Sequence, residues 1–258
     1  FIGYHLIKKI SEKNTYIIDV LDTVKKNRFD RDFKTILKKN NINYICSKFN
    51  NLKNISKFDY IIHLAATVGV KNVSQAPFQT LKNNLTDSVE FIERINKKTK
   101  IIFFSTSEVY KNLITKKNFS FSEQINIPLK SNIEPRDTYF ISKLLVEKII
   151  KLKKNKFLIL RPHNFYGPRM GNKHVISEMI SKISKKKIIK VKSFNHKRCF
   201  CYIDDAINIM TKLIFTEKFY NNVFNIGNPN QEITIFNLIK KIKKIMNKNI
   251  ILKKIHFE

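Results

Sequence analysis

The sequence is poor in glycine, cysteine and arginine, and it contains no tryptophan. Its three cysteines, Cys46, Cys199 and Cys201, are an odd number without the spacing of a disulfide framework. This excludes a secreted scaffold held by disulfides and indicates a reducing, cytoplasmic location. No apolar run approaches the ~18 residues of a membrane-spanning helix, and the opening FIGYHLIKKISEK does not resemble a signal peptide. We therefore expect no membrane partner.

Acidic residues are also scarce: 20 of them face 50 lysines and arginines, so the net charge is +30. Such a charge suggests nucleic-acid binding, but only seven of the basic residues are arginine, the usual reader of phosphates and bases. Lysine pairs are spread over the whole chain, alongside abundant asparagine and isoleucine, which is typical of A/T-rich codon usage. We expect a solvated basic surface and no nucleic-acid partner. The alternative, a nucleic-acid-binding protein, predicts a contiguous positive face and steep salt dependence.

The 43% hydrophobic content is that of a globular protein. Apolar, β-branched runs alternate with amphipathic stretches, which predicts an α/β fold with a doubly wound parallel sheet. The predicted strands are 15–22, 42–49, 58–66, 100–107 and 156–162, and the predicted helices are 3–13, 30–40, 77–97 and 138–154.

The pattern changes after residue 162. Helices are predicted at 174–185, 205–217 and 234–246, the last capped by Thr234, and strands at 187–193 and in NVFNIG. We expect a Rossmann-like domain at 1–162 and a mainly substrate-binding α/β lobe at 163–258, with 200–230 returning to the main sheet. Cys199 and Cys201 fit alternate positions of a strand. Two cysteines do not complete a metal site, so we expect no metal.

Two groups of residues are candidates for catalysis. Tyr139 and Lys143 are four residues apart on a predicted helix and share one face. A neighbouring ammonium and an oxidised nicotinamide favour the phenolate, so Tyr139 can act as a general base toward a hydroxyl. The segment STSEVY (105–110) stands at the carboxyl end of a predicted strand, where ligands bind in open α/β sheets. The small residues of HLAA (63–66) allow a flat ring to approach the backbone.

The first residues fit the end of a dinucleotide-binding turn, in which a glycine-rich loop opens a helix that faces the pyrophosphate. Gly3 would be the last glycine of that turn. The acid that binds the adenosine ribose is expected about 20 residues on. Asp22 stands there at the end of a predicted strand, whereas its competitor Asp19 falls mid-strand. On this interpretation the first strand and the first two glycines are missing.

These motifs together resemble the extended short-chain dehydrogenase/reductases, the NAD-dependent nucleotide-sugar epimerase/dehydratase family. The resemblance covers nearly the whole chain and rests on FIG, Asp22, HLAA, Asn84, STSEVY, YFISK, RPHNFYGPRMG, RCFCYIDD and NIGNPNQEITI. It implies a Rossmann-like fold, NAD as cofactor and a nucleotide-diphosphate sugar, such as a UDP-sugar, as substrate. It also implies a homodimer formed through helices 77–97 and 138–154.

The resemblance implies a role for each matching residue. Thr106 would hydrogen-bond the sugar O4, Tyr139 would be the base for oxidation at C4, and Lys143 would support it. The implied cofactor-binding residues are Phe1, Ile2, Gly3, Asp22, Asn51, Leu64, Ala65, Ala66, Asn84, Tyr139, Lys143 and Pro162. The implied substrate-binding residues are Asn164, Arg169, Val175 and Arg198, with Asn164 and Arg198 directed toward the diphosphate or the sugar.

The two residues after Thr106 bear on the reaction. Dehydratases related to the dTDP-glucose enzyme have Asp-Glu there, whereas Ser107-Glu108 resembles UDP-glucuronate decarboxylases and also GDP-mannose-type dehydratases. RCFCYIDD and GPRM favour decarboxylases and UDP-sugar epimerases. We therefore expect decarboxylation or 4-epimerisation, with 4,6-dehydration as the alternative. A catalytically inactive NAD-binding scaffold or sensor is the alternative of another class, and retention of the three catalytic residues argues against it.

The chain departs from the family pattern at several points. Lys111 stands where glycine is usual, so we expect a different turn after Tyr110. Asn51 stands where an aspartate usually meets the adenine, and its carbonyl oxygen can still accept a hydrogen bond. We interpret the chain as cut at both ends. Residues 1–258 alone are therefore expected to bind NAD weakly or not at all in calorimetry, and to be inactive.

Overall fold

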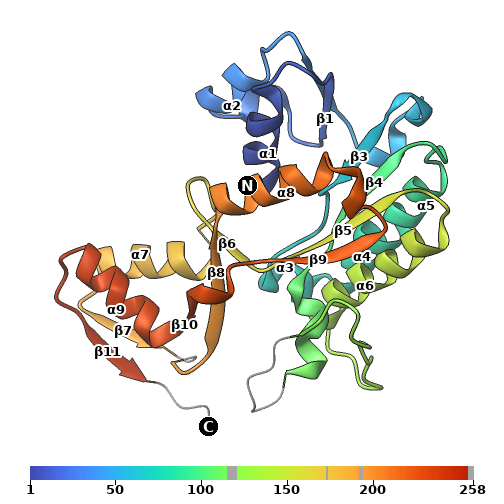
Figure 1. Cartoon of the computed structure of the whole chain (residues 1–258). Helices are drawn as coiled ribbons and strands as arrows, with labels where there is room; N and C mark the ends of the chain where they lie inside the picture. The colour runs from blue at the N-terminus through green and yellow to red at the C-terminus, as the bar shows by residue number, and fades with distance from the viewer. Residues whose placement is uncertain (115–120, 173, 192–193, 255–258) are drawn as a thin grey trace. The chain divides into compact units, whose positions relative to one another are not determined.

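The computed structural model describes residues 1–114, 121–172, 174–191 and 194–254. They form two compact units (Figure 1). The main unit comprises Ile2–Pro162 and Ile207–Ile226, and the small unit comprises His163–Ala206 and Gly227–Glu258 together with Phe1.

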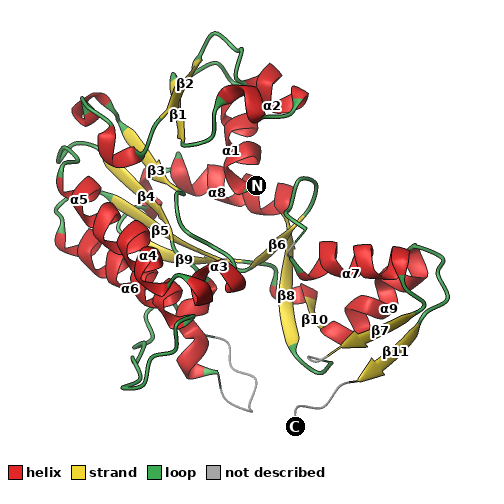
Figure 2. Ribbon diagram, turned by 180° about the vertical axis from the view of Figure 1, so that it is seen from behind, coloured by secondary structure: helices red, strands yellow, loops and turns green. Residues whose placement is uncertain are grey.

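A parallel sheet of four strands forms the centre of the main unit. Its strands, in spatial order, are β3 (Tyr60–His63), β4 (Lys100–Phe104), β5 (Phe157–Pro162) and β9 (Asn222–Ile226). Helices α5 (Asp87–Glu93) and α6 (Asp137–Leu152) pack against the sheet (Figure 2). Their residues Phe91 and Val146 belong to one buried apolar core with Phe103 of β4. Because all four strands run parallel, the residues that follow β3, β4 and β5 lie along one edge of the sheet.

A second parallel pair, β1 (Ile18–Asp22) and β2 (Ile42–Cys46), places Asp22 opposite Cys46. Helices α1 (Ile2–Ser11) and α2 (Arg31–Ile36) accompany it and share a small core around Val20. No described strand pairs with both β1 and β3. The single sheet that the sequence predicts is therefore divided into the pair β1–β2 and the four-stranded sheet. The parallel α/β fold class itself is confirmed.

The predicted helix 77–97 is interrupted. The main unit contains α3 (Val70–Gln75) and α4 (Pro77–Leu81), and a π-helical turn, Lys82–Thr86, then joins α4 to α5. Within this turn the buried side chain of Asn84 hydrogen-bonds the backbone of a loop that precedes α3. Such π-turns are frequent at functional sites. Short 3₁₀ segments occur at Lys26–Arg28, Phe49–Asn51, Ile55–Lys57, Ser107–Leu113, Glu217–Phe219 and Pro229–Gln231.

The small unit contains a mixed sheet, a parallel pair and two helices. The mixed sheet has the order β10 (Glu232–Thr234), β8 (Lys197–Tyr202) and β6 (Asn164–Tyr166), and the parallel pair is β7 (Ile188–Val191) with β11 (Ile251–Lys254). Helices α7 (Val175–Lys185) and α9 (Ile235–Ile245) enclose an apolar core with them. Helix α8 (Ile203–Ile214) contains the boundary between the two units.

Most predicted elements are confirmed, and their ends differ from the predicted ones by a few residues. The Thr234 cap is confirmed, because its hydroxyl accepts a hydrogen bond from the backbone of Asn237 at 3.1 Å. Cys199 and Cys201 do alternate on β8, and Cys201 is buried. In the part of the chain that the structure describes, no helix is long and apolar enough to cross a membrane.

Candidate active site

The segment after β4 begins the candidate site. Thr106 caps the 3₁₀ segment Ser107–Leu113: its hydroxyl oxygen accepts a hydrogen bond from the backbone of Glu108 at 3.1 Å. The preceding residue, Ser105, is 4% exposed, and its hydroxyl has no hydrogen-bond partner among the described residues. A buried hydroxyl that lacks a partner at the carboxyl end of a strand fits a position meant for a ligand.

Tyr139 lies in the first turn of α6 and contacts Thr106. Burial, together with the charge of Glu108, raises the pKa of Tyr139 to about 12, although a hydrogen bond with the Thr106 side chain acts in the opposite direction. Without a bound cofactor the phenol is thus protonated at neutral pH. The lowered pKa expected from sequence requires the positive charge of an oxidised nicotinamide.

Lys143, one turn after Tyr139, is buried in the main unit with only 3% exposed. Its ammonium donates a hydrogen bond to the carbonyl oxygen of Phe104 at 2.8 Å and lies 4.7 Å from the centre of the Phe103 ring. Burial lowers the pKa of Lys143 to about 7, although the charge of Glu147 raises it. Lys143 therefore links α6 directly to the end of β4, and its protonation responds to changes near neutral pH.

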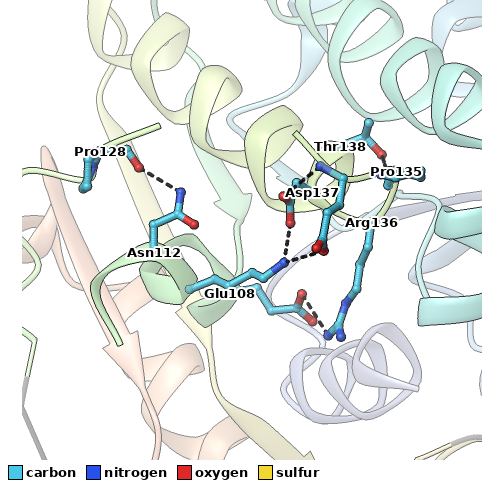
Figure 3. Close-up of polar contacts among 9 residues, drawn as sticks. Glu108, Asn112, Pro128, Pro135, Arg136, Asp137 and Thr138 are labelled. Carbon is cyan, nitrogen blue, oxygen red and sulfur yellow. Dashed lines mark hydrogen bonds and ion pairs between the residues drawn. The ribbon is translucent and has the colours of Figure 1, made fainter. Parts of the chain in front are cut away.

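Ion pairs join the 3₁₀ segment Ser107–Leu113 to the residues around the start of α6 (Figure 3). Glu108 and Arg136 approach to 3.4 Å, with both side chains more than 40% exposed. The ammonium of Lys111 lies 2.5 Å from Asp137 and 3.4 Å from Glu134. Lys111 lies inside the 3₁₀ segment and has no positive φ, so this position does not require glycine.

The residues after β3 lie at the same carboxyl end of the sheet as the residues after β4. Leu64, Ala65 and Ala66 follow β3, and the next residue, Thr67, is fixed by Asn84. Its backbone donates to the Asn84 side-chain oxygen at 2.6 Å, and its carbonyl accepts from the Asn84 side-chain nitrogen at 3.0 Å. The Asn84 amide, predicted to bind cofactor, thus holds the loop in this structure.

The predicted cofactor residues all belong to the main unit, except Phe1, which is grouped with the small unit. Asp22 is exposed at the end of β1, and its Oδ1 accepts from the backbone of Val24 at 3.0 Å. Asp19 instead binds Lys57 at 2.8 Å and Asn43 at 2.9 Å. These contacts favour Asp22 over Asp19 as the ribose ligand.

Gly3 lies in the first turn of α1, and an added Cβ there would meet Leu64 at an ordinary 3.7 Å. Among the described residues, no close approach requires a glycine at this position. Asn51 is exposed at the end of a 3₁₀ segment, and Pro162 ends β5.

The predicted substrate residues belong to the small unit, and their roles stay predictions. Asn164 donates to the carbonyl oxygen of Cys199 at 3.2 Å, which joins β6 to β8. Arg169 has a positive φ of 71°, Val175 begins α7, and Arg198 is exposed on β8. Thr106, Glu108, Tyr139 and Lys143 all belong to the main unit.

A buried polar network behind the site was not predicted. Arg161 and Glu147 are 3% and 1% exposed and form two hydrogen bonds, at 3.0 and 2.7 Å. Arg161 also donates to the hydroxyl of Tyr110 at 2.6 Å, and that hydroxyl donates to Asn225 at 2.8 Å. The sequence signal was Glu147 four residues after Lys143, on the face of α6 that faces the sheet.

Two curated proteins are similar to this chain. The bifunctional polymyxin resistance protein ArnA of Wigglesworthia glossinidia brevipalpis is 30% identical over 96% of the chain, which spans only 40% of that protein. UDP-D-apiose/UDP-D-xylose synthase 1 of Arabidopsis thaliana is 26% identical over 96% of the chain, which spans 73% of that protein.

A solved structure shows the same fold. UDP-glucuronic acid 4-epimerase from Bacillus cereus, in complex with UDP-glucuronic acid and NAD, superposes with a TM-score of 0.82 at 24% identity, over 99% of this chain and 83% of that one. The family model described as NAD dependent epimerase/dehydratase matches residues 1–227, which contain the whole cluster around Tyr139. The chain thus belongs to the NAD dependent epimerase/dehydratase family.

Proposed function

We propose that the protein carries out an NAD-dependent modification of a nucleotide-diphosphate sugar through transient oxidation at C4, ending in decarboxylation or 4-epimerisation. The observation that carries this proposal is the cluster of Thr106, Tyr139 and Lys143 at the carboxyl edge of the parallel sheet. The named activities of the relatives, a UDP-sugar synthase and a UDP-glucuronic acid 4-epimerase, support the substrate class.

Residues of this chain fit the cofactor. The unpartnered hydroxyl of Ser105 stands at the end of β4, and the exposed carboxylate of Asp22 can accept hydrogen bonds from a ribose. The small side chains of Ala65 and Ala66 follow β3 at the same edge of the sheet as β4. NAD, when bound, supplies a reversible hydride acceptor.

The chain's own residues perform the proton chemistry. Tyr139 removes the proton from the sugar O4 while the adjacent C–H bond is broken, and it returns the proton when the carbon is reduced. Thr106, already in contact with Tyr139, orients the hydroxyl. Lys143, one turn after Tyr139 on α6 and held by the carbonyl oxygen of Phe104, is the residue that we assign to support the base.

Glu108 directs the choice of reaction. The negative charge of its carboxylate lies close enough to Tyr139 to raise the pKa of that phenol. A carboxylate is not needed for simple epimerisation, so its presence favours decarboxylation or, as the second candidate, 4,6-dehydration. Ser107 beside it is the other residue assigned to this step.

A substrate panel tests the proposal. The full-length protein is incubated with NAD and UDP-, GDP-, dTDP- and CDP-sugars, and the products are read by mass and chromatography. Loss of CO2, loss of water, and an isomer of unchanged mass identify decarboxylase, dehydratase and epimerase. Tyr139→Phe is the control. No product from any sugar, with NAD nevertheless bound, would overturn the proposal in favour of an inactive scaffold or sensor.

We also propose a cytoplasmic homodimer. All three cysteines are free, which supports a reducing compartment. Helices α4 and α6 expose Phe78 at 86% and Leu152 at 83%, and large apolar side chains exposed on one pair of packed helices favour association. Light scattering is expected to give twice the chain mass, and Phe78→Glu with Leu152→Glu is expected to give the monomer.

A further inference from the structure

The candidate site is assembled from two segments that are distant in the sequence. One is the 3₁₀ segment Ser107–Leu113, entered at Thr106, and the other is the start of α6, which carries Tyr139. Between them the described residues form no helix or strand. Regular backbone hydrogen bonding therefore does not fix Tyr139 relative to Thr106, and side chains must do so.

Lys111 makes the shortest of the outer ion pairs between these segments. Its ammonium lies 2.5 Å from Asp137 Oδ1, and the Asp137 side chain is only 10% exposed. Asp137 Oδ2 accepts a hydrogen bond from the backbone of Glu134 at 3.2 Å, and the backbone of Asp137 donates to the Glu134 carbonyl at 2.8 Å. One carboxylate thus holds both Lys111 and the turn that enters α6.

The Lys111–Asp137 pair contributes more to holding the two segments together than the pair of Glu108 and Arg136 does. Glu108 and Arg136 are 3.4 Å apart and well exposed, so water and salt screen them. The Asp137 carboxylate is largely removed from water, and loss of its cation would leave a mostly buried charge held only by the backbone hydrogen bond from Glu134. The lowest-energy response is movement of the helix start, so that the carboxylate reaches water.

We propose that Lys111 is a positioning residue, which holds the first turn of α6 so that Tyr139 stays in register with Thr106. Asp137 is the first residue of α6 and Tyr139 is the third, so a displacement of one moves the other. A misplacement of ~1 Å can lower a rate ~10²-fold. The glycine usual at this position in the family has no side chain to make this link. The kinetic part of the proposal rests on the proposed function.

Hydrogen exchange of the full-length protein tests the link without reference to catalysis. Lys111→Met and Asp137→Asn are each expected to speed amide exchange at residues 134–140 at least about tenfold, because a loosened turn opens more often. Lys111→Arg, which keeps the charge, is expected to restore slow exchange. The matched control is Lys156→Met, which removes a lysine from the exposed pair with Glu217 and leaves exchange at 134–140 unchanged.

Kinetics supply the second arm. With the substrate found above, Lys111→Met is expected to lower kcat about 10- to 100-fold with little change in the KM for NAD, and Lys111→Arg to recover most of it. Unchanged exchange and unchanged kcat in both Lys111→Met and Asp137→Asn would overturn the proposal. If the wild type turns over no nucleotide sugar, the proposed function fails, and the exchange arm still decides the role of Lys111.

Discussion

At the scale of single residues, Lys143 couples the candidate site to pH. Burial lowers its pKa to about 7 in the folded chain, whereas a lysine in the unfolded chain titrates near about 10.4. Between these values the unfolded state binds more protons, so the contribution of Lys143 to the free energy of unfolding rises with pH. Below about pH 7 this contribution is at its least favourable and stays constant.

Urea unfolding checks this sign. The free energy of unfolding of the wild type, minus that of Lys143→Met, is expected to increase by a few kcal/mol between about pH 7 and about pH 10. The subtraction removes the titration of the other groups. A difference that is flat or falls over this range would show that the buried ammonium does not have the lowered pKa.

Gly167 is the glycine with the strictest requirement. Its φ is 152°, and an added Cβ would lie far inside van der Waals contact with Ile203 Cγ2 and 3.2 Å from Ile203 Cβ. Ile203 is completely buried and cannot move aside easily. Gly167→Ala is therefore expected to destabilise the fold by about 2–4 kcal/mol in chemical denaturation. Gly171→Ala is the control, because there an added Cβ meets only His174 at 3.7 Å.

At the scale of elements, the pair Glu147–Arg161 joins α6 to β5 in the dry interior. Removing one charge leaves the other buried and unpaired, so Glu147→Gln is expected to cost about 3–5 kcal/mol of unfolding free energy. Glu217→Gln also removes a carboxylate from ion pairs with two lysines, but this carboxylate is exposed, so its denaturation midpoint should stay close to wild type. Equal effects of the two changes would contradict this role for burial.

Sequence reasoning predicted those elements whose cause is local. The run KIIFF identifies β4 because its two β-branched isoleucines and two phenylalanines form a continuous apolar stretch. Tyr139 and Lys143 share a face because helical spacing requires it. The prediction of one continuous helix over 77–97 was wrong. The helix is interrupted at Asn84, whose side chain hydrogen-bonds the backbone of Thr67, and a partner so distant in the sequence cannot be predicted from local pattern. Sequence reasoning noted Lys111 as unusual but did not predict its partner Asp137, because that residue is also distant in the sequence.

At the scale of the whole molecule, the charge of +30 works against compactness. Repulsion among scattered lysines is screened by salt, and the Debye length falls from about 30 Å at 0.01 M to about 10 Å at 0.1 M. The free energy of unfolding is expected to rise over this range of sodium chloride, as measured by urea midpoints. A fall would mean that exposed ion pairs outweigh the repulsion.

The register of β1 and β2 provides an optical probe. Cys46 is exposed opposite Asp22, whereas Cys201 is buried and Cys199 is half-buried, with its thiol donating to the carbonyl oxygen of Asn228. A thiol-reactive fluorophore will therefore label Cys46 first, next to the Asp22 carboxylate that we propose as the ribose ligand. Because the chain has no tryptophan, its intrinsic emission does not overlap the dye. Dinucleotide titrations can thus be followed by emission from one defined point of the fold.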